Sequence, residues 1–327
     1  MERFRNGFDG ASDGAFKLAH LSDLHATPVE IESPRDLFGK RALGWLSWRR
    51  RRRKEHRPEV LEALIEDLHA QDADHVGVTG DLTHLGLDSE IRAAAGWLER
   101  LGPPARVSVV PGNHDAYAGR RGAERWAPWA SYMGTHAPEG REAAADPTED
   151  ERGTEGFPWV RRLGAVALVG VSSARPTAPL LATGRVGARQ RAELEALLGR
   201  LAEEGRPRVL LIHHPPLPAG QSRRRQLDDA EAVRALLARA GAELVLHGHT
   251  HRTHLDRVAG PAGPIPVVGV PSSSAVGRRP GRRARYHLYR IVPAEPRSGV
   301  PRCTLSLEVR GFDASAGRFV AAASRSL

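Results

Sequence analysis

Five short blocks of metal-binding residue types constrain this chain more than any other feature. Each block directly follows an apolar stretch rich in Val, Ile and Leu, the composition of a buried strand. The blocks are Asp23-Leu24-His25, Gly80-Asp81 with Gly86 five residues after the aspartate, Gly112-Asn113-His114-Asp115, His213-His214, and Gly248-His249-Thr250-His251. Loops just past the carboxyl ends of such strands are where α/β proteins build their sites. The pattern therefore predicts an α/β domain whose strand ends carry a two-metal centre.

The order of the predicted elements favours parallel pairing of the strands. Apolar runs alternate with amphipathic stretches along the first three quarters of the chain. The predicted strands are 16–21, 75–79, 106–110, 165–171, 208–212 and 243–247, and the predicted helices start at Pro58 and cover 88–100, 187–204 and 228–240. This alternation is typical of parallel strands with helical crossovers. Only shorter β-type runs remain after His251, so we expect the C-terminal part, 258–327, to add strands as a second sheet.

Three segments depart from this alternation. Residues 1–14 are polar and Gly-rich, and we expect them to be disordered ahead of one domain at 15–327. Residues 27–57 form an insertion rich in Trp and Arg. Residues 116–157 are aromatic, then acidic and Gly-rich, with little strand signal. Because long loops in compact domains are usually functional or disordered, we expect 116–157 to form a cap over the site.

The part of the insertion from Leu37 to Lys54 has three interpretations. Its aromatic and aliphatic residues stop where a run of five arginines, 49–53, begins. It could be a surface helix that packs on the domain and leaves its arginines solvated. It could rest on an anionic membrane surface, with aromatic side chains inserted and arginines on the headgroups. It could also be a basic gate that draws phosphorylated substrates toward the metals.

Composition limits the cellular compartment and the kinds of partner that we expect for this protein. The chain has 327 residues, a formal charge of +9 and one cysteine, Cys303. A single cysteine excludes an internal disulfide and indicates a reducing cytoplasm. No stretch approaches the roughly 18 apolar residues of a membrane span, and the N-terminus lacks the apolar centre of a secretory signal. Almost all the basic residues are arginine, a compositional bias that explains much of the charge, so we do not expect a nucleic-acid partner.

The residue types in the five blocks suit hydrolysis of a phosphate ester. Two cations about 3.5–4 Å apart can clamp a phosphoryl group and activate a water. Asp81 is the natural carboxylate to bridge them. Carboxylate, Asn carbonyl and imidazole together suit Mn, Fe or Zn better than Ca or a structural Zn. The neighbouring glycines, Gly80, Gly112 and Gly248, permit the tight turns that would aim these side chains at one point.

These five motifs, complete and in order from residue 23 to 251, resemble those of the calcineurin-like metallophosphoesterase superfamily. The residues in these motifs are most similar to those of the bacterial class III cyclic nucleotide and glycerophosphodiester phosphodiesterases. The resemblance implies a four-layer α-β-β-α sandwich with a dinuclear metal site at the carboxyl ends of the strands. It also implies hydrolysis of a phosphodiester by a metal-activated water or hydroxide.

The resemblance further implies roles for the matched residues. The first metal would be held by Asp23, His25, Asp81 and His251. The second would be held by Asp81, Asn113, His213 and His249, with Asp81 bridging. His114 would lie outside the metal ligands and donate to the phosphate or protonate the leaving oxygen, and Asp115 would orient its neighbours by a hydrogen bond. Spacing alone does not separate His213 from His214; the family pattern selects His213.

Two positions bear on which branch of the superfamily is meant. His84 stands where purple acid phosphatases place a tyrosine ligand, which argues against that branch. His84 could contact a metal or fill a polar turn, and we favour the turn. The UDP-diacylglucosamine pyrophosphohydrolases carry Arg in place of His114, which argues against a direct match. The Trp/Arg insertion nevertheless keeps a membrane-surface hydrolase of a phospholipid or nucleotide-linked lipid as the alternative, with a nuclease as a minor one.

Overall fold

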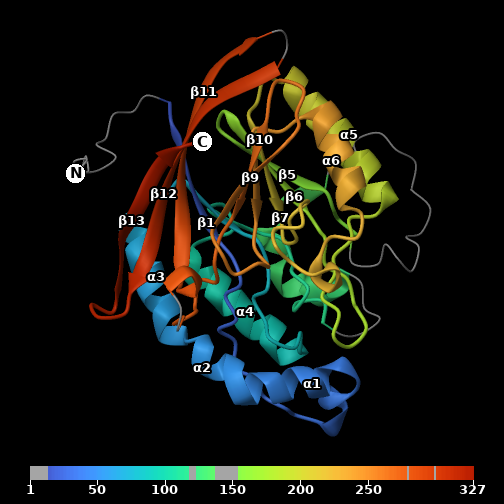
Figure 1. Ribbon diagram of the computed structural model, residues 1–327, viewed down its shortest axis with the longest axis vertical. Coiled ribbons are helices and arrows are strands. Elements are labelled where there is room, and N and C mark those ends of the chain that lie inside the picture. Colours follow the sequence, from blue (N-terminus) through green and yellow to red (C-terminus); the bar gives the residue numbers. More distant parts are fainter. Residues whose placement is uncertain (1–13, 118–122, 137–153, 278–279, 298–299) are drawn as a thin grey trace.

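The computed structural model describes residues 14–117, 123–136, 154–277, 280–297 and 300–327 (Figure 1). The predicted disorder of the N-terminus therefore concerns residues almost all of which lie outside the described part of the chain. Among the described residues, no helix is both long enough and apolar enough to cross a membrane.

Two mixed β-sheets form the centre of the molecule. The first sheet has the order β13-β12-β11-β1-β2-β3 and the second β4-β5-β6-β7-β8-β10-β9. The strands of the first are β1 (Phe16–Leu21), β2 (His75–Val78), β3 (Val107–Val109), β11 (Arg285–Arg297), β12 (Val300–Asp313) and β13 (Arg318–Ser326). Those of the second are β4 (Thr135–His136), β5 (Trp159–Leu163), β6 (Val166–Val171), β7 (Arg208–Ile212), β8 (Leu244–His247), β9 (His254–Val258) and β10 (Ile265–Gly269).

The predicted crossover helices are present and the strands they join are parallel. The helices are α3 (Pro58–Ala70), α4 (Asp88–Leu101), α5 (Ala188–Glu203) and α6 (Ala230–Ala240). Strands β1, β2 and β3 pair in parallel, as do β6, β7 and β8. The apolar residues of α3 recur at helical spacing, and Val60, Leu61 and Leu64 are buried on one face of it. The alternation in the sequence therefore predicted the element types and the pairing direction correctly.

The molecule has four layers, helix, sheet, sheet, helix, as Figure 1 shows. Alternate residues of β7 point to opposite sides: Leu211 packs in the core between the sheets, and Leu210 in the core under α5 and α6. The two sheets meet face to face, since a Cβ on Gly77 of β2 would lie 3.2 Å from the Leu211 side chain. Helices α3 and α4 cover the other face of the first sheet. This arrangement confirms the predicted α-β-β-α sandwich.

The prediction that the C-terminal strands form a second sheet of their own is wrong. Strands β9 and β10 join the second sheet, while β11, β12 and β13 extend the first. The junction is antiparallel, with Phe16 of β1 opposite Ile291 of β11. Strand β1 offers the open edge of the parallel β1-β2-β3 group, and β11 satisfies the backbone groups along it. A hydrophobic pattern identifies a strand without indicating which edge it joins.

The described part of 116–157 does not cover the site. It forms a 3-10 helix, η3 (Ala123–Tyr132), and strand β4 at the edge of the second sheet. Trp126 and Trp129 of η3 are buried in the core, and the Trp129 indole donates to the carbonyl of Ile91 in α4 at 2.9 Å. These contacts fix η3 against α4, and Arg125 of η3 donates to the Asp115 carbonyl at 3.3 Å, so η3 lies beside the ligand loop after β3, while none of its residues lines the pocket at the site. The rest of the predicted cap, 118–122 and 137–153, lies outside the described residues.

Insertion 27–57 forms a helical arm that runs alongside the ends of α3 and α4 (Figure 1). The arm consists of α1 (Lys40–Ser47), a π-helical turn η2 (Trp48–Arg52) and α2 (Arg53–Glu55). Trp45 packs against the small apolar cluster of Leu85, Leu87 and Tyr117. The arm is therefore anchored on the domain by part of its apolar surface.

Candidate metal centre

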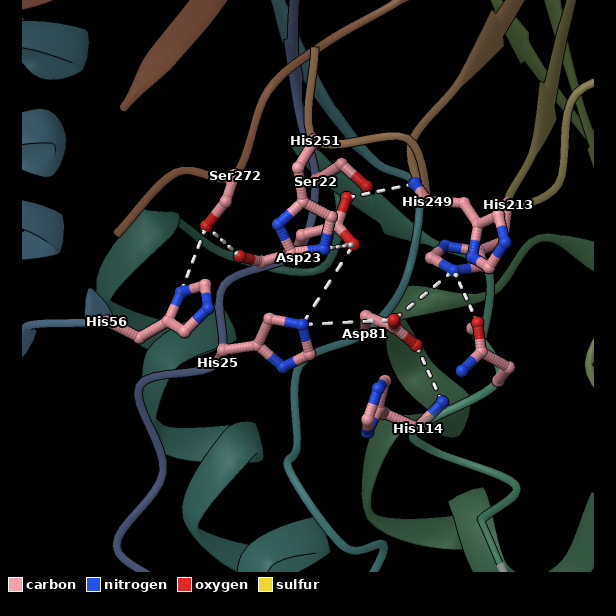
Figure 2. Close-up of polar contacts among 12 residues, drawn as sticks. Ser22, Asp23, His25, His56, Asp81, His114, His213, His249, His251 and Ser272 are labelled. Atoms are coloured by element: carbon pink, nitrogen blue, oxygen red, sulfur yellow. Dashed lines mark hydrogen bonds and ion pairs between the residues drawn. The ribbon is translucent and has the colours of Figure 1, made fainter. Parts of the chain in front are cut away.

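The five blocks lie on loops that follow β1, β2, β3, β7 and β8, and these loops meet at one end of the two sheets. Figure 2 shows the side chains pointing toward a common centre. Those expected to bind metal are Asp23, His25, Asp81, Asn113, His213, His249 and His251. All seven lie at this centre, and those of them with carboxylate or imidazole groups belong to overlapping groups whose ligand atoms are within 4.8 Å of one another.

Five of these seven residues have a left-handed backbone. The φ angles are 52° at Asp23, 43° at His25, 54° at Asp81, 64° at His249 and 51° at His251. A residue with a Cβ rarely adopts this conformation, which costs about 1–3 kcal/mol each and is concentrated at functional sites. The sharp turns aim the five side chains back over the strand ends. This concentration of left-handed residues is typical of a functional site.

Asp81 lies in the middle of the cluster. Its Oδ2 is 3.3 Å from Nε2 of His213 and 3.8 Å from Nε2 of His25. Its Oδ1 accepts a hydrogen bond from the His114 backbone N–H at 2.7 Å. Asp23 lies to one side, with Oδ1 3.1 Å from Nε2 of His251. The Asp81 carboxylate is thus shared between the groups that contain His25 and His213, the arrangement that a bridging ligand requires.

Backbone carbonyls orient two of the imidazoles. Nδ1 of His25 donates to the Thr83 carbonyl at 2.7 Å, and Nδ1 of His213 donates to the Thr79 carbonyl at 2.6 Å. With the hydrogen on Nδ1, the lone pair on each Nε2 faces the centre. A metal-binding histidine usually donates its other ring nitrogen in this way. Both tautomers are therefore the ones that a metal ion needs.

The remaining predicted ligands lie around His213. Oδ1 of Asn113 is 3.3 Å from its Nε2, and the ring of His249 is 5.1 Å away between centroids. The neighbouring His214 is also within ligand range of this group. However, Nδ1 of His214 is 2.8 Å from the Ser173 hydroxyl and its Nε2 is 3.3 Å from the Ala182 carbonyl. Both of its nitrogens have other partners, which favours His213 as the ligand.

Two glycines allow the loops to approach this closely. A Cβ on Gly112 would overlap Oδ1 of Asp81, and one on Gly248 would overlap the hydroxyl of Ser22. Neither glycine has a positive φ, so the requirement is one of space. The sequence-based expectation placed glycine here for turn conformation, and the observed reason at these two positions is close packing.

Negative charge is concentrated at the centre. Asp23 and Asp81 are buried, and within the described residues their only ion-pair partners are histidines. Burial by itself lowers the pKa of His213, but the adjacent Asp81 and Asp23 carboxylates outweigh it and raise that pKa to about 9. The two buried carboxylates thus favour positive charge at this centre, which metal ions would supply. Two carboxylates, an amide oxygen and four imidazoles without a competing Lys or Arg are a donor set that fits Mn, Fe or Zn ions.

His114 lies beside this donor set and is oriented away from it. Its Nδ1 donates to the His84 carbonyl at 2.6 Å, which leaves Nε2 as an acceptor for Nη1 of Arg52 at 2.9 Å. His114 is within ligand range of His25 and Asp81, yet both its nitrogens are already bonded. The His84 ring stacks on His25 at 5.2 Å and belongs to none of the metal-binding groups among the described residues.

Asp115 braces two of the ligand loops. Its Oδ2 accepts from the Gly112 N–H at 2.9 Å, and its Oδ1 accepts from the N–H of Thr83 at 3.0 Å and from the Thr83 hydroxyl at 2.9 Å. Burial, together with the nearby Asp81 charge, raises the pKa of Asp115 to about 7. Asp115 therefore connects the loop after β3 to the loop after β2, next to His25 and His114.

Sequence reasoning missed two residues of the arm that line the site. Arg52 and His56 are one helical turn apart and both border a pocket of about 470 Å³ that includes the predicted ligands. Nδ1 of His56 is 3.0 Å from the Ser274 hydroxyl, and its ring is 4.7 Å from that of His25. Their i, i+4 spacing places both on one helix face. Because Arg52 is one of five consecutive arginines, the sequence did not indicate which of the five points into the site.

Comparison with known proteins identifies the family. The profile of the calcineurin-like phosphoesterase family (Metallophos) matches residues 16–253, and the chain belongs to this family. No curated protein matches the sequence.

Solved structures with the same fold include a dimetal phosphatase from Danio rerio, with a TM-score of 0.54 and 12% identity over 94% of this chain and 98% of that chain. Another is the purple acid phosphatase PPD1 from yellow lupin (Lupinus luteus) seeds, with a TM-score of 0.57 and 14% identity over 95% of this chain and 54% of that chain. At these identities the likeness extends to the fold alone.

Proposed function

We propose that this protein is a phosphodiesterase that uses two metal ions. The observation that carries the proposal is the position of Asp81, whose carboxylate lies between the His25 and His213 imidazoles. Asp23 and His251 would complete one ion's ligands, and Asn113 and His249 the other's. Two such ions would neutralise the phosphoryl oxygens and activate a water for attack on phosphorus.

The chain's own residues would handle the leaving group. His114 borders the pocket, and its Nδ1 donates to the His84 carbonyl, which leaves Nε2 as the nitrogen on the side of Arg52. A bound substrate would take over the Arg52 donor that Nε2 now accepts, which would free Nε2 for the ester oxygens. From there a protonated His114 would hydrogen bond to the phosphate or give its proton to the departing oxygen. Asp115 would hold the loop that carries His114 in place through its hydrogen bonds to Thr83.

The test is turnover with defined metals and simple substrates. Purified protein is supplied with Mn, Fe or Zn and given bis-p-nitrophenyl phosphate, a diester, and p-nitrophenyl phosphate, a monoester. We expect the diester to be hydrolysed faster, and chelation to abolish the reaction. If no diester is hydrolysed with any of the three metals, including cyclic AMP and glycerophosphodiesters, the protein is a binding scaffold and the proposal is wrong.

A second candidate, a hydrolase of membrane lipids, is supported by the outer surface of the arm. The side chains of Phe38, Leu43 and Leu46 are 70%, 51% and 37% exposed. They lie close in sequence to exposed arginines of the 49–53 run. Apolar side chains beside arginines suit the boundary between an acyl layer and anionic headgroups. Each arginine near such a surface contributes about 1 kcal/mol, over a Debye length of about 8 Å at physiological salt.

Vesicle co-sedimentation tests this candidate. If the arm rests on membranes, the protein should sediment with anionic vesicles at low salt and be released at high salt. Replacing Arg49, Arg51 and Arg53 by Gln should abolish sedimentation and leave hydrolysis of a small diester unchanged, since these three side chains are exposed. Failure of the unmodified protein to sediment even at low salt would rule this candidate out.

A further inference from the structure

One arginine of the run at 49–53 differs from the others. Arg49, Arg50, Arg51 and Arg53 are exposed, whereas Arg52 is partly buried and borders the pocket at the metal centre. Arg52 ends the π-helical turn η2. Such turns are rare and are frequently found at functional sites. The arm thus brings one guanidinium to the site and leaves its neighbours in solvent.

The Arg52 guanidinium has no carboxylate partner among the described residues. Within the described residues, its side-chain hydrogen bonds go to the imidazole of His114. Burial lowers the pKa of Arg52, Tyr117 and the Asp81 and Asp23 carboxylates oppose this effect, and the charge of Arg225 adds to it. A partly buried guanidinium whose hydrogen-bond partner among the described residues is an imidazole and not a carboxylate is unfavourable, since a buried charge is costly unless it is paired. This geometry indicates that an anion from outside the chain completes the pair.

Arg225 comes to the pocket from a different element. It lies on the short 3-10 turn Arg223–Arg225, which precedes α6. Its backbone carbonyl is 2.8 Å from Nε2 of His249, which ties this turn to the metal centre. Within the described residues, the Arg225 side chain forms no ion pair either. Arg52 and Arg225 therefore approach the same volume from two separate parts of the fold.

The charge balance of the pocket exceeds what one phosphate needs. Two divalent ions would bring four positive charges against the two carboxylates of Asp23 and Asp81, and a phosphodiester and the activated hydroxide, with one negative charge each, would balance the difference. Beyond this the pocket is lined by further cations, and Asp81 is the one carboxylate among its described lining residues. Arg52, Arg225 and Arg252 are among these cationic lining residues. Such a surface matches a ligand with more than one anionic group.

We propose that the substrate carries a second anionic group beside the scissile phosphodiester, as in a nucleoside diphosphate ester, and that Arg52 and Arg225 bind this group. The inference rests on the proposed function and narrows its substrate class. Guanidinium groups suit this role because they form paired, charge-assisted hydrogen bonds with phosphate oxygens. Arg52 and Arg225 would position the substrate, while the metal centre and His114 would carry out the chemistry.

Inhibition by UDP and UMP, which differ by one phosphate, tests the proposal. The inhibition constants are measured against hydrolysis of bis-p-nitrophenyl phosphate with excess Mn, and direct binding is measured by calorimetry. We expect UDP to bind at least about tenfold more tightly than UMP. Arg52→Gln should weaken the binding of UDP by about 10–10²-fold, which is the effect of losing hydrogen bonds to a charged group. The same variant should weaken the binding of UMP much less. Arg225→Gln should act in the same direction.

Two further variants separate binding from folding. Arg52→Lys keeps the charge without the paired donors and should recover part of the UDP affinity. Arg51→Gln, from the exposed part of the same run, should behave as wild type. Equal inhibition by UDP and UMP, unchanged in Arg52→Gln, would overturn the inference while diester hydrolysis upheld the proposed function. Absence of diester hydrolysis in the wild type would instead reject the proposed function.

Discussion

A methyl group added at Gly112 should displace the Asp81 side chain while leaving the chemical identity of every predicted ligand unchanged. The Cβ of alanine at this position would overlap Oδ1 of Asp81 and lie 2.5 Å from its backbone nitrogen and 2.8 Å from its Cγ. Ordinary van der Waals contact begins near 3.4 Å. The Cγ atom of Asp81, at 2.8 Å, must therefore move by at least about 0.6 Å. Because a backbone atom is also in the way, a change of rotamer does not relieve the overlap.

The expected cost follows from this displacement. Overpacking of this kind destabilises a fold by about 1–3 kcal/mol. Misplacing a catalytic group by about 1 Å costs on the order of 10²-fold in rate. We therefore expect Gly112→Ala to lower kcat on bis-p-nitrophenyl phosphate by about 10–10²-fold and to weaken metal binding. Thermal unfolding, elemental analysis and kinetics measure the three effects separately.

Gly96→Ala is the matched control for this variant. Gly96 lies within α4, and a Cβ there would meet no atom within 4 Å. Alanine in a helix interior is about 1 kcal/mol more favourable than glycine, so this variant should unfold at a slightly higher temperature with unchanged kcat. Full metal content and wild-type kcat in Gly112→Ala would show that the Asp81 carboxylate does not lie where the structure places it.

One further variant, at His114, and one labelling reaction, at Cys303, test separate parts of the structure. His114→Ala should reduce turnover by about 10²–10⁴-fold with metal content intact, and the loss should shrink for esters with good leaving groups; loss of a metal would make His114 a ligand. Burial raises the pKa of Cys303 to about 12, so at pH 8 the folded protein should react slowly with a thiol reagent and the denatured protein quickly. Rapid labelling of the folded protein would contradict the described packing of β12.

The sequence predicted the ligand loops because two independent signals coincide there. Apolar runs of strand length mark the strand ends, and the residues that follow them, such as Asp81 and His213, have the chemistry of metal ligands. The parallel pairing followed from the alternation of strands and helices. The structure adds what no local pattern contains, namely the left-handed backbone at Asp23, Asp81 and His249.

Other features depend on contacts between distant segments, and these the sequence did not reveal. Strand β5 has charged Arg161 and Arg162 within it, and β13 is mostly exposed, so neither has a buried strand's composition. The position of Arg52 depends on how the arm packs, and its four neighbours are chemically identical. The placement of β11 against β1 is a choice between sheet edges. Each of these is decided by tertiary packing, which overrides local preference.

The bound metal in Asp81→Ala tests the central claim most directly. The wild-type protein, purified and loaded with Mn, should contain two metal ions per chain by elemental analysis. Because the Asp81 carboxylate is shared by the two ligand groups, its removal should lower the content toward zero, while circular dichroism shows that the fold persists. Two metals per chain in the folded variant would contradict a two-metal centre built around Asp81.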